Sequence, residues 1–225
     1  TQLYVWIIPI SAFIGSLTMT LMVYRISIAQ GRVQVVTMLL AGIGINALAF
    51  AVMGLAVFLA DDSQIRTITF WSLGSLAGGN WKGLAIAGPL MLLAIFWLPV
   101  LSRSMDVLAV GESEAYHLGI DVERLRFTTI LLVALSVGAS VALTGMVGFI
   151  GLIVPHLLRM VVGPSHRILL PASALFGATL LIGSDLLART IVQPSELPLG
   201  VVTAFLGVPY FLWLLIKSKE SGGLV

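Results

Sequence analysis

The sequence has 225 residues, of which 59% are hydrophobic and 10% are charged, and its mean hydropathy is +1.09. A soluble domain carries about 25% charged residues and about 45–50% apolar ones, so this composition excludes a soluble enzyme and a disordered chain. A formal net charge of +2 is too small to indicate nucleic acid as a partner, and the absence of cysteine excludes disulfides and thiolate metal sites. We therefore expect this chain to be embedded in the lipid bilayer.

Seven apolar runs, each close to the roughly 20 residues that cross a bilayer, indicate membrane-spanning helices. They are apolar around most of their circumference and lack a period of two, which favours an all-α, polytopic transmembrane helical bundle. In chain order the predicted spans are Leu3–Tyr24, Val35–Ala60, Leu84–Leu101, Phe127–Leu143, Met146–Val162, Leu169–Leu187 and Val201–Ile216. A tight reversal at Thr144-Gly145 would separate the fourth span from the fifth.

The lysine and arginine positions predict the orientation, because cytosolic connections carry an excess of positive charge. If the first span runs from outside to inside, three basic residues lie outside, namely Arg66, Lys82 and Arg189. The other nine lie in the cytosol, namely Arg25, Arg32, Arg103, Arg124, Arg126, Arg159, Arg167, Lys217 and Lys219. The C-terminus is then cytosolic. Seven spans also leave the N-terminus outside, and we expect further helices to precede it.

Two connections are too long to be simple turns. The outer one, Asp61–Gly83, contains the semi-apolar stretch Phe70–Leu76, which we expect to form a short helix at the outer mouth. Trp71 and Trp81 would then lie at the depth of the lipid headgroups, as interfacial aromatic residues commonly do. The inner connection, Ser102–Arg126, is the most charged part of the chain.

The inner connection contains the pattern of a short helix. The helix would begin at Gly111, with Glu112 and Glu114 in its first turn, where the helix dipole favours anions. Gly119 suits the end of the helix. Ala115 and Leu118 are three residues apart and would share one small apolar face. From these residues alone, the segment is either a solvated loop or a docking site for a cytosolic partner.

The pattern Gly-Glu-x-x-Ala-x-x-Leu-Gly is followed by four further motifs in a fixed order. They are Gly148–Arg159, Gly163–Arg167, Asp185–Arg189 and the run from Glu196 to Phe211. In this order and spacing the chain closely resembles the permease subunit of ABC importers for iron-siderophores, haem and vitamin B12. The resemblance covers essentially the whole chain.

The resemblance implies an architecture and a set of partners. Permeases of this family usually have ten spanning helices, of which the seven spans here match helices four to ten. Residues 1–225 would form one permease domain, with a cytosolic coupling region at 103–126. Two permeases form a homodimer in the bacterial cytoplasmic (inner) membrane. Two cytosolic ATPase subunits hold ATP and Mg, and a periplasmic or lipid-anchored binding protein delivers the substrate.

By resemblance, Gly111, Glu112, Ala115, Leu118 and Gly119 form the coupling helix that docks on the ATPase. Ala115 would permit close approach, and Glu112 would offer a charge to the partner. The chain lacks the Gly-x-x-x-x-Gly-Lys-Ser/Thr phosphate-binding loop. We therefore expect a transport subunit that is not an enzyme and binds no cofactor of its own.

On the outer side, resemblance assigns Arg189 to docking of the binding protein, with Arg66 a weaker candidate. Asp185 lies four residues before Arg189, at the spacing of an ion pair on one helix turn. Pairing within the chain and docking are both compatible with this spacing.

On the inner side, the turn corresponding to the connection between the first two spans narrows the pathway in the family. Its residues are Gln34, Val35, Val36 and Thr37. They form either an inner gate or an ordinary interhelical loop.

Three glycines, Gly145, Gly148 and Gly151, recur every third residue and are predicted to lie on one face of a helix, where small residues allow close packing. The three histidines, His117, His156 and His166, do not have the spacing of metal ligands, and we expect no metal site.

Other functions remain to be weighed. A secondary transporter or channel would need no ATPase, but such proteins usually place ionisable residues near the membrane midplane, and these spans have essentially none. No nucleophile–base pair indicates an intramembrane enzyme. An ABC permease for free zinc or manganese is a nearer alternative.

For the substrate, Phe58–Arg66 and Thr69–Leu76 look most like haem-transporting members, although siderophore and cobalamin permeases share this framework.

Overall fold

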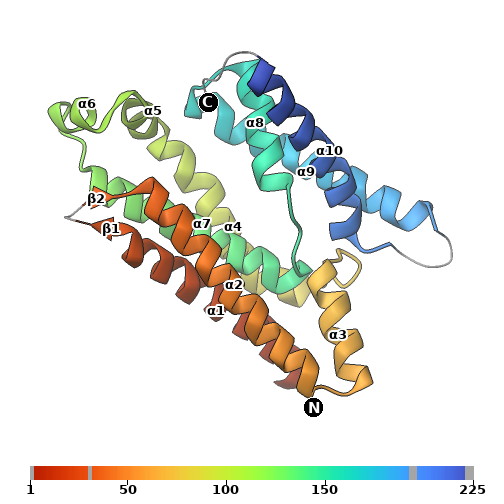
Figure 1. The fold of residues 1–225 in the computed structure, drawn as a ribbon. Helices are drawn as coiled ribbons and strands as arrows, with labels where there is room; N and C mark the ends of the chain where they lie inside the picture. Colours follow the sequence, from red (N-terminus) through yellow and green to blue (C-terminus); the bar gives the residue numbers. More distant parts are fainter. Residues whose placement is uncertain (1–2, 30–31, 193–196, 221–225) are drawn as a thin grey trace. The chain divides into compact units, whose positions relative to one another are not determined.

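The computed structural model describes residues 3–29, 32–192 and 197–220, which are almost entirely α-helical (Figure 1). The predicted fold class, an all-α polytopic bundle, is confirmed. The helices fall into two units, described separately below. The first unit comprises Thr1–Phe70 and Gly79–Leu143, and the second comprises Trp71–Gly78 and Thr144–Val225. That residues 1–225 act as one permease domain stays a prediction.

Each predicted span corresponds to a helix. Among the described residues, five helical stretches are long and apolar enough to cross a membrane, namely Pro9–Ser27, Val35–Leu59, Trp81–Val110, Val122–Thr144 and His166–Thr190. Two apolar helices are shorter, Ile150–Val162 and Leu199–Leu214. Most side chains of these helices stay on the surface of their unit, as expected where lipid takes the place of water.

The first unit begins with two antiparallel helices. Helix α1 (Leu3–Ser27) packs against α2 (Val35–Leu59), and the two run side by side in Figure 1. A two-stranded antiparallel ribbon of β1 (Ile28–Ala29) and β2 (Arg32–Val33) joins them. Ser27 is fully buried below the ribbon, and its carbonyl oxygen accepts the N–H of Gln34 at 2.9 Å. The described part of this connection is therefore a paired β-ribbon.

Helix α3 (Asp62–Leu73) follows α2 and begins with a reciprocal cap. The Asp61 carboxylate accepts the backbone N–H of Gln64 at 2.9 Å, while the Gln64 side chain accepts the N–H of Asp61 at 3.3 Å. This is a capping box with an aspartate as its first residue. The expected short helix over Phe70–Leu76 was only partly right, because α3 starts eight residues earlier and ends at Leu73.

The helical run from Trp81 to Val110 contains three elements: α4 (Trp81–Trp97), a 3-10 turn η1 (Leu98–Leu101) and α5 (Ser102–Val110). The Asn80 side chain caps α4 by accepting the N–H of Gly83 at 2.7 Å. Pro99 lies at the start of η1, where a missing N–H costs nothing. The helical path therefore continues from the apolar α4 into the charged connection that follows it.

Two further helices complete the first unit. The short α6 (Glu112–His117) leads to α7 (Val122–Thr144), whose buried residues are mostly small or leucine. A Cβ atom on Gly138 would lie 3.2 Å from the Phe13 ring and 3.4 Å from Ser16, both on α1. Small residues let helix backbones approach in a membrane, so α7 is packed closely on α1.

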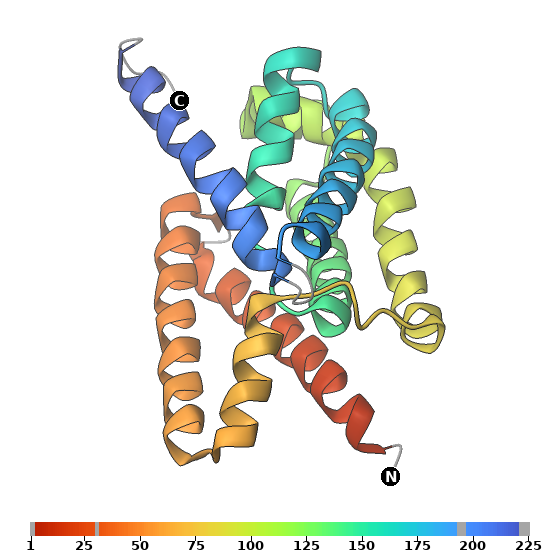
Figure 2. The same ribbon diagram turned by 90° about the vertical axis from the view of Figure 1, so that its right-hand side faces the viewer.

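The second unit contains α8 (Ile150–Val162), α9 (His166–Thr190) and α10 (Leu199–Glu220). Helix α8 packs against both α9 and α10, and α9 also packs against α10 (Figure 2). The predicted span Met146–Val162 was too long at its start, since residues 145–149 are not helical. Segment 71–78, which contains the last three residues of α3 and the turn after it, also belongs to this unit.

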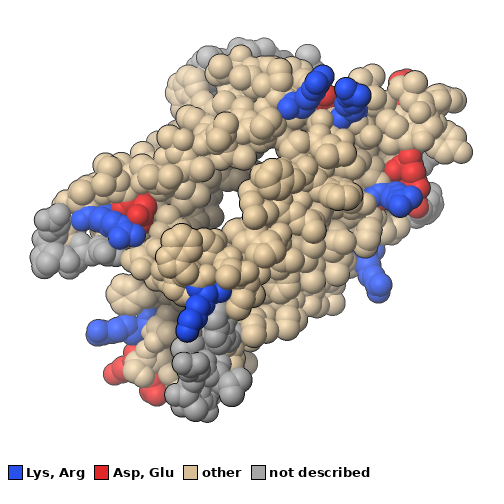
Figure 3. Space-filling model, turned by 180° about the vertical axis from the view of Figure 1, so that it is seen from behind, with Lys and Arg blue, Asp and Glu red and all other residues tan. Residues whose placement is uncertain are grey.

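Charged side chains are sparse on the surface. Figure 3 shows one face of the molecule, on which lysine, arginine, aspartate and glutamate form small separate groups divided by wide uncharged areas. Only 10% of the residues are charged, and the long helices carry few of them. Such a surface suits contact with hydrocarbon better than contact with water.

Candidate functional site

The coupling segment predicted from the sequence forms the short helix α6 in the first unit. Gly111 precedes it in an extended conformation, and Glu112 and Glu114 lie in its first turn. The helix ends in a Schellman motif: Gly119 has φ +76, and its N–H donates to the carbonyl oxygen of Tyr116 at 3.0 Å. The N–H of Ile120 donates to the carbonyl oxygen of Ala115, also at 3.0 Å. The predicted helix and its glycine end are confirmed.

Two residues of the motif that were expected to share one face differ sharply in exposure. Ala115 is fully buried, whereas Leu118 is 69% exposed. The Ala115 methyl group is covered by the chain itself as α6 packs on α5, and its role in the approach of a partner stays a prediction. The exposed apolar side chains of this region are Val110, Tyr116 and Leu118. Val110 and Tyr116 were missed, although an exposed apolar side chain within a charged segment is itself a signal.

The carboxylate of Glu112 forms an ion pair within the chain. Its Oε1 pairs with Nη2 of Arg126, which lies one turn into α7. A cavity of about 1000 Å³ lies between α6 and the start of α7. It is lined by Glu112, Ser113, Tyr116, Gly119, Ile120, Asp121, Val122, Glu123 and Arg126. Arg126 was not predicted as a site residue, since nothing local connects positions 14 residues apart.

The proposed gate residues lie directly after the β-ribbon. Gln34 precedes α2, and its side-chain Oε1 accepts the hydroxyl of Thr37 at 2.9 Å. Val35 and Val36 are strongly exposed in the first turn of α2. Whether these residues act as a gate or only connect the two helices stays open, and the gate stays a prediction.

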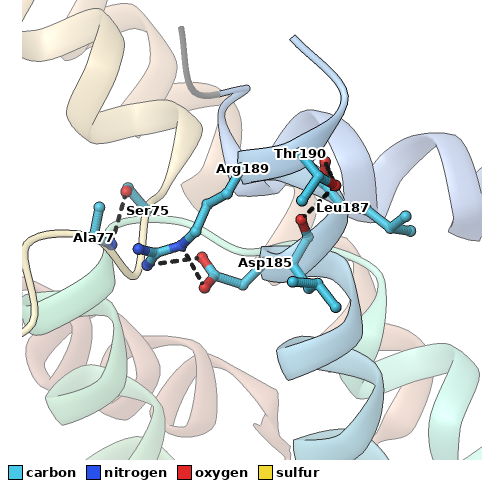
Figure 4. Close-up of polar contacts among 7 residues, drawn as sticks. Ser75, Ala77, Asp185, Leu187, Arg189 and Thr190 are labelled. Atoms are coloured by element: carbon cyan, nitrogen blue, oxygen red, sulfur yellow. Dashed lines mark hydrogen bonds and ion pairs between the residues drawn. The ribbon is translucent and has the colours of Figure 1, made fainter. Parts of the chain in front are cut away.

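The Asp185–Arg189 pair lies near the end of α9 in the second unit. Nε of Arg189 lies 2.8 Å from Oδ2 of Asp185, and Nη2 lies 3.4 Å from Oδ1, so the carboxylate is held by two nitrogens (Figure 4). The predicted ion pair is confirmed. Both side chains keep part of their surface exposed. Arg66 is exposed on α3 in the first unit. Docking of a binding protein by either arginine stays a prediction.

The prediction that Gly145, Gly148 and Gly151 line one face of one helix was wrong. Helix α8 begins at Ile150, so only Gly151 is helical. Gly145 ends α7 with φ +71, and a Cβ atom there would lie 2.2 Å from the carbonyl oxygen of Trp71. Gly148 and Gly151 have open space around them. The close approach at Gly145 is therefore between backbones of a turn and of α3, and not between two helix faces.

Gly145 belongs to a junction of three segments within the second unit, comprising residues 71–75, 144–146 and 199–200. The N–H of Ser75 donates to the carbonyl oxygen of Thr144 at 2.8 Å, and the N–H of Leu199 donates to that of Gly74 at 3.0 Å. Gly74 itself has φ +70, and a Cβ atom on it would lie 2.4 Å from the carbonyl oxygen of Met146. We call this set the glycine junction.

An apolar cavity of about 640 Å³ adjoins the glycine junction. Phe149 lies on its wall with φ +68, an uncommon backbone conformation for an aromatic residue. A Cβ atom added to Gly207 of α10 would lie 2.6 Å from the Cβ atom of Phe149. The remaining lining residues are Ser72, Leu73, Met146, Gly148, Gly200, Val201, Ala204, Phe205, Val208 and Pro209. No group of three or more histidine, aspartate or glutamate residues in the described ranges is arranged to hold a metal ion.

The sequence was compared with known protein families and proteins. The model of the FecCD transport family matches residues 1–217. The chain belongs to the FecCD transport family. Its family and its apolar helices together identify a multi-pass membrane protein of a transport system.

Two relatives of this FecCD chain have curated names. The hemin transport system permease protein HmuU of Yersinia pestis is 44% identical over 212 residues, which cover 94% of this chain and 63% of that protein. The vitamin B12 import system permease protein BtuC of Vibrio cholerae is 42% identical over 211 residues, with the same coverage of 94% and 63%. The FecCD chain thus spans just under two thirds of the length of these relatives.

A solved structure has the same fold as this FecCD chain. It is described as an inward-facing conformation of a metal-chelate type ABC transporter. The two align with a TM-score of 0.80 and 31% sequence identity, over 95% of this chain and 74% of that one. The helical order found here is therefore that of a known ABC transporter chain.

Proposed function

We propose that this chain is the membrane-spanning permease part of an ATP-driven importer that carries a metal chelate across the inner membrane. The observation that carries the proposal is α6, a short rigid helix that presents Tyr116 and Leu118 outward from a charged connection. Exposed apolar side chains with acidic neighbours suit a protein partner. Membership of the FecCD transport family supports an ABC ATPase as that partner.

The proposed assembly has two permease copies, two cytosolic ATPase subunits and a substrate-binding protein on the outer side. The distribution of lysine and arginine supports the orientation, with α6 and the C-terminus in the cytosol. In this orientation Arg189 of α9 faces the outer solution, and its guanidinium pairs with a carboxylate of the binding protein. Gln34–Thr37 and the β-ribbon before them lie at the inner end of the pathway, where they act as a gate.

For the substrate, we propose a metal held in a tetrapyrrole-type macrocycle, with haem as the first candidate. The support is that one relative is named for hemin and another, of similar identity, for vitamin B12. Both are large metal chelates built on a rigid macrocycle. The 640 Å³ apolar cavity offers a surface of matching chemistry.

The test uses the complete permease with its ATPase and its binding protein, reconstituted in liposomes. Uptake of haem, cyanocobalamin and a ferric siderophore is measured with ATP on the ATPase side. We expect uptake of one tetrapyrrole-type chelate that requires both ATP and the binding protein. Uptake driven by a proton or sodium gradient without the ATPase would instead identify a secondary transporter. Uptake of the free metal ion alone would identify a different class of ABC permease.

A further inference from the structure

The backbone alone does not set the direction of α6 relative to α7. The helix has only six residues, Glu112–His117, and is flanked by non-helical residues on both sides. Its C-terminal end is tied to α7 by the turn through Gly119, Ile120 and Asp121, where the Asp121 carboxylate accepts the N–H of Arg124 at 3.0 Å. Packing of α6 on α5 buries Ala115 but does not by itself tie the N-terminal end of α6 to α7.

The N-terminal end of α6 is tied to α7 by a side-chain contact. Glu112 is the first residue of α6, and its carboxylate pairs with the Arg126 guanidinium. Together the turn and the ion pair close a loop over residues 112–126, so that α6 is held to α7 at both of its ends. The approximately 1000 Å³ cavity lies within this loop.

The two members of the pair are exposed to different extents. The Arg126 side chain is 20% exposed and that of Glu112 is 43% exposed. The Arg126 guanidinium is therefore the more shielded member of the pair. A pair that is partly shielded from water is stronger than a fully exposed one and is less screened by salt.

Helix α7 is in turn well placed to pass a movement onward within the first unit. Its small face is buried, with Gly138 close to Phe13 and Ser16 of α1, and the ring of Phe127 lies 5.8 Å from that of Tyr24. These two contacts give α7 a route by which a displacement can reach α1.

We propose that Arg126 is a positioning residue that fixes α6 to α7 through Glu112, so that a displacement of α6 by the ATPase becomes a displacement of α7. This inference rests on the proposed function of α6 as the docking helix. It assigns Glu112 to the inside of the permease and leaves the exposed apolar side chains of α6 as the surface for the ATPase.

The first test measures substrate imported per ATP hydrolysed in the reconstituted importer. Arg126→Gln is expected to lower this ratio about threefold or more while the ATPase still co-purifies with the permease. The reversed pair, Glu112→Arg with Arg126→Glu, is expected to restore at least half of the loss. Arg124→Gln is the matched control, because Arg124 is exposed on the same turn of α7 and is expected to leave the ratio unchanged.

Three results would overturn the inference. They are an unchanged ratio in Arg126→Gln, no rescue by the reversed pair, and loss of ATPase co-purification in Arg126→Gln, which would place Arg126 in the docking surface. Failure of the proposed function is distinguishable, because the unmodified complete permease would then show no ATPase-dependent uptake at all.

A second measurement does not depend on transport. The 225 residues contain no cysteine, so spin labels at Ser113→Cys on α6 and Glu123→Cys on α7 report the distance between the two helices. We expect a narrow distance distribution in the parent and a broad one after Arg126→Gln or Glu112→Gln. If neither substitution broadens the distribution, the ion pair does not position α6.

Discussion

A Cβ atom on Gly200 would lie 2.5 Å from the carbonyl oxygen of Leu73, a distance that real Cβ atoms essentially never show. Leu73 is the last residue of α3, and Gly200 is in the first turn of α10. The start of α10 therefore rests directly on the backbone at the end of α3. No side chain larger than hydrogen fits between them unless one segment moves.

This contact predicts that Gly200→Ala destabilises the second unit. The added methyl meets backbone atoms, which cannot rotate away as a flexible side chain can, so we expect a cost of about 1–3 kcal/mol. Thermal unfolding of the purified permease in detergent measures the loss. Gly183→Ala on α9 is the control, because nothing lies within 4 Å of its added Cβ. Equal midpoints for the two variants would contradict the close approach.

Gly145→Ala is expected to be harmful for two reasons. The residue has φ +71, which costs an alanine about 1–2 kcal/mol, and its Cβ would lie 2.2 Å from the carbonyl oxygen of Trp71. We expect low yield of folded permease and a lower unfolding temperature than in the parent. Gly148→Ala, three residues further in the same break, has open space and should behave as the parent. A harmless Gly145→Ala would show that the turn is built differently.

The surface of α6 predicts a separation between folding and docking. Tyr116→Ala removes a side chain that is 78% exposed, so we expect unchanged stability but weaker ATPase association, by about 1 kcal/mol or more if Tyr116 is central to the contact. Ala115→Trp places a large ring at a fully buried position and should displace α6 and abolish uptake while membrane insertion persists. Co-purification and uptake are measured for both. Survival of uptake and association in Ala115→Trp would refute the coupling assignment.

Arg189→Glu is expected to weaken capture of the binding protein, because a like charge would face the incoming carboxylate. The loss should depend on salt, since the charges are partly exposed. Affinity is measured on the reconstituted complete permease. The control Asp185→Asn with Arg189→Gln removes both partners and avoids an unpaired charge. If the double neutral variant binds as well as the parent, Arg189 serves only its pair with Asp185.

Asp61 predicts a pH dependence at the start of α3. The backbone N–H of Gln64, and then the Ser63 hydroxyl, lower the pKa of Asp61 below its ordinary value of 3.8. Because the folded-state pKa is depressed, the cap is fully present above pH 3.8 and is lost as the pH falls through the lower value. Hydrogen exchange at Gln64 should be slower in the parent than in Asp61→Ala at neutral pH, and the difference should vanish in acid. Asp62→Asn, which changes a neighbouring carboxylate, should leave this exchange unchanged.

Continuous apolar length was enough to predict all seven apolar helices, although α8 begins later than predicted. Spans of this composition have one stable conformation in lipid, since every backbone group must bond within its own helix. The α6 helix was predicted for a local reason as well, because Gly111, the acidic first turn and Gly119 mark both of its ends. The Asp185–Arg189 pair followed from helix spacing alone.

The features that the sequence did not predict all depend on contacts between distant residues. A period of three in Gly145, Gly148 and Gly151 resembles a helix face, but the left-handed turn at Gly145 follows from its contact with Trp71, 74 positions earlier. The pairing of Glu112 with Arg126 likewise requires α6 to fold back along α7. The burial of Ala115 depends on α5, and no pattern within the motif distinguishes a buried small residue from an exposed one.

The hydrogen bond from Leu199 to Gly74 joins residues that leave the ribosome 125 positions apart. At about 5–20 residues per second, the partner of Gly74 is made about 6–25 s after Gly74 itself. Throughout that interval the carbonyl oxygen of Gly74 lacks this partner, and an unsatisfied carbonyl is costly wherever water is excluded. Until Leu199 is made, this carbonyl must therefore accept a hydrogen bond from water or from the insertion machinery. A chain stopped before Leu199 should remain sensitive to proteolysis or quality control at residues 71–78, even with six of its seven apolar helices already inserted.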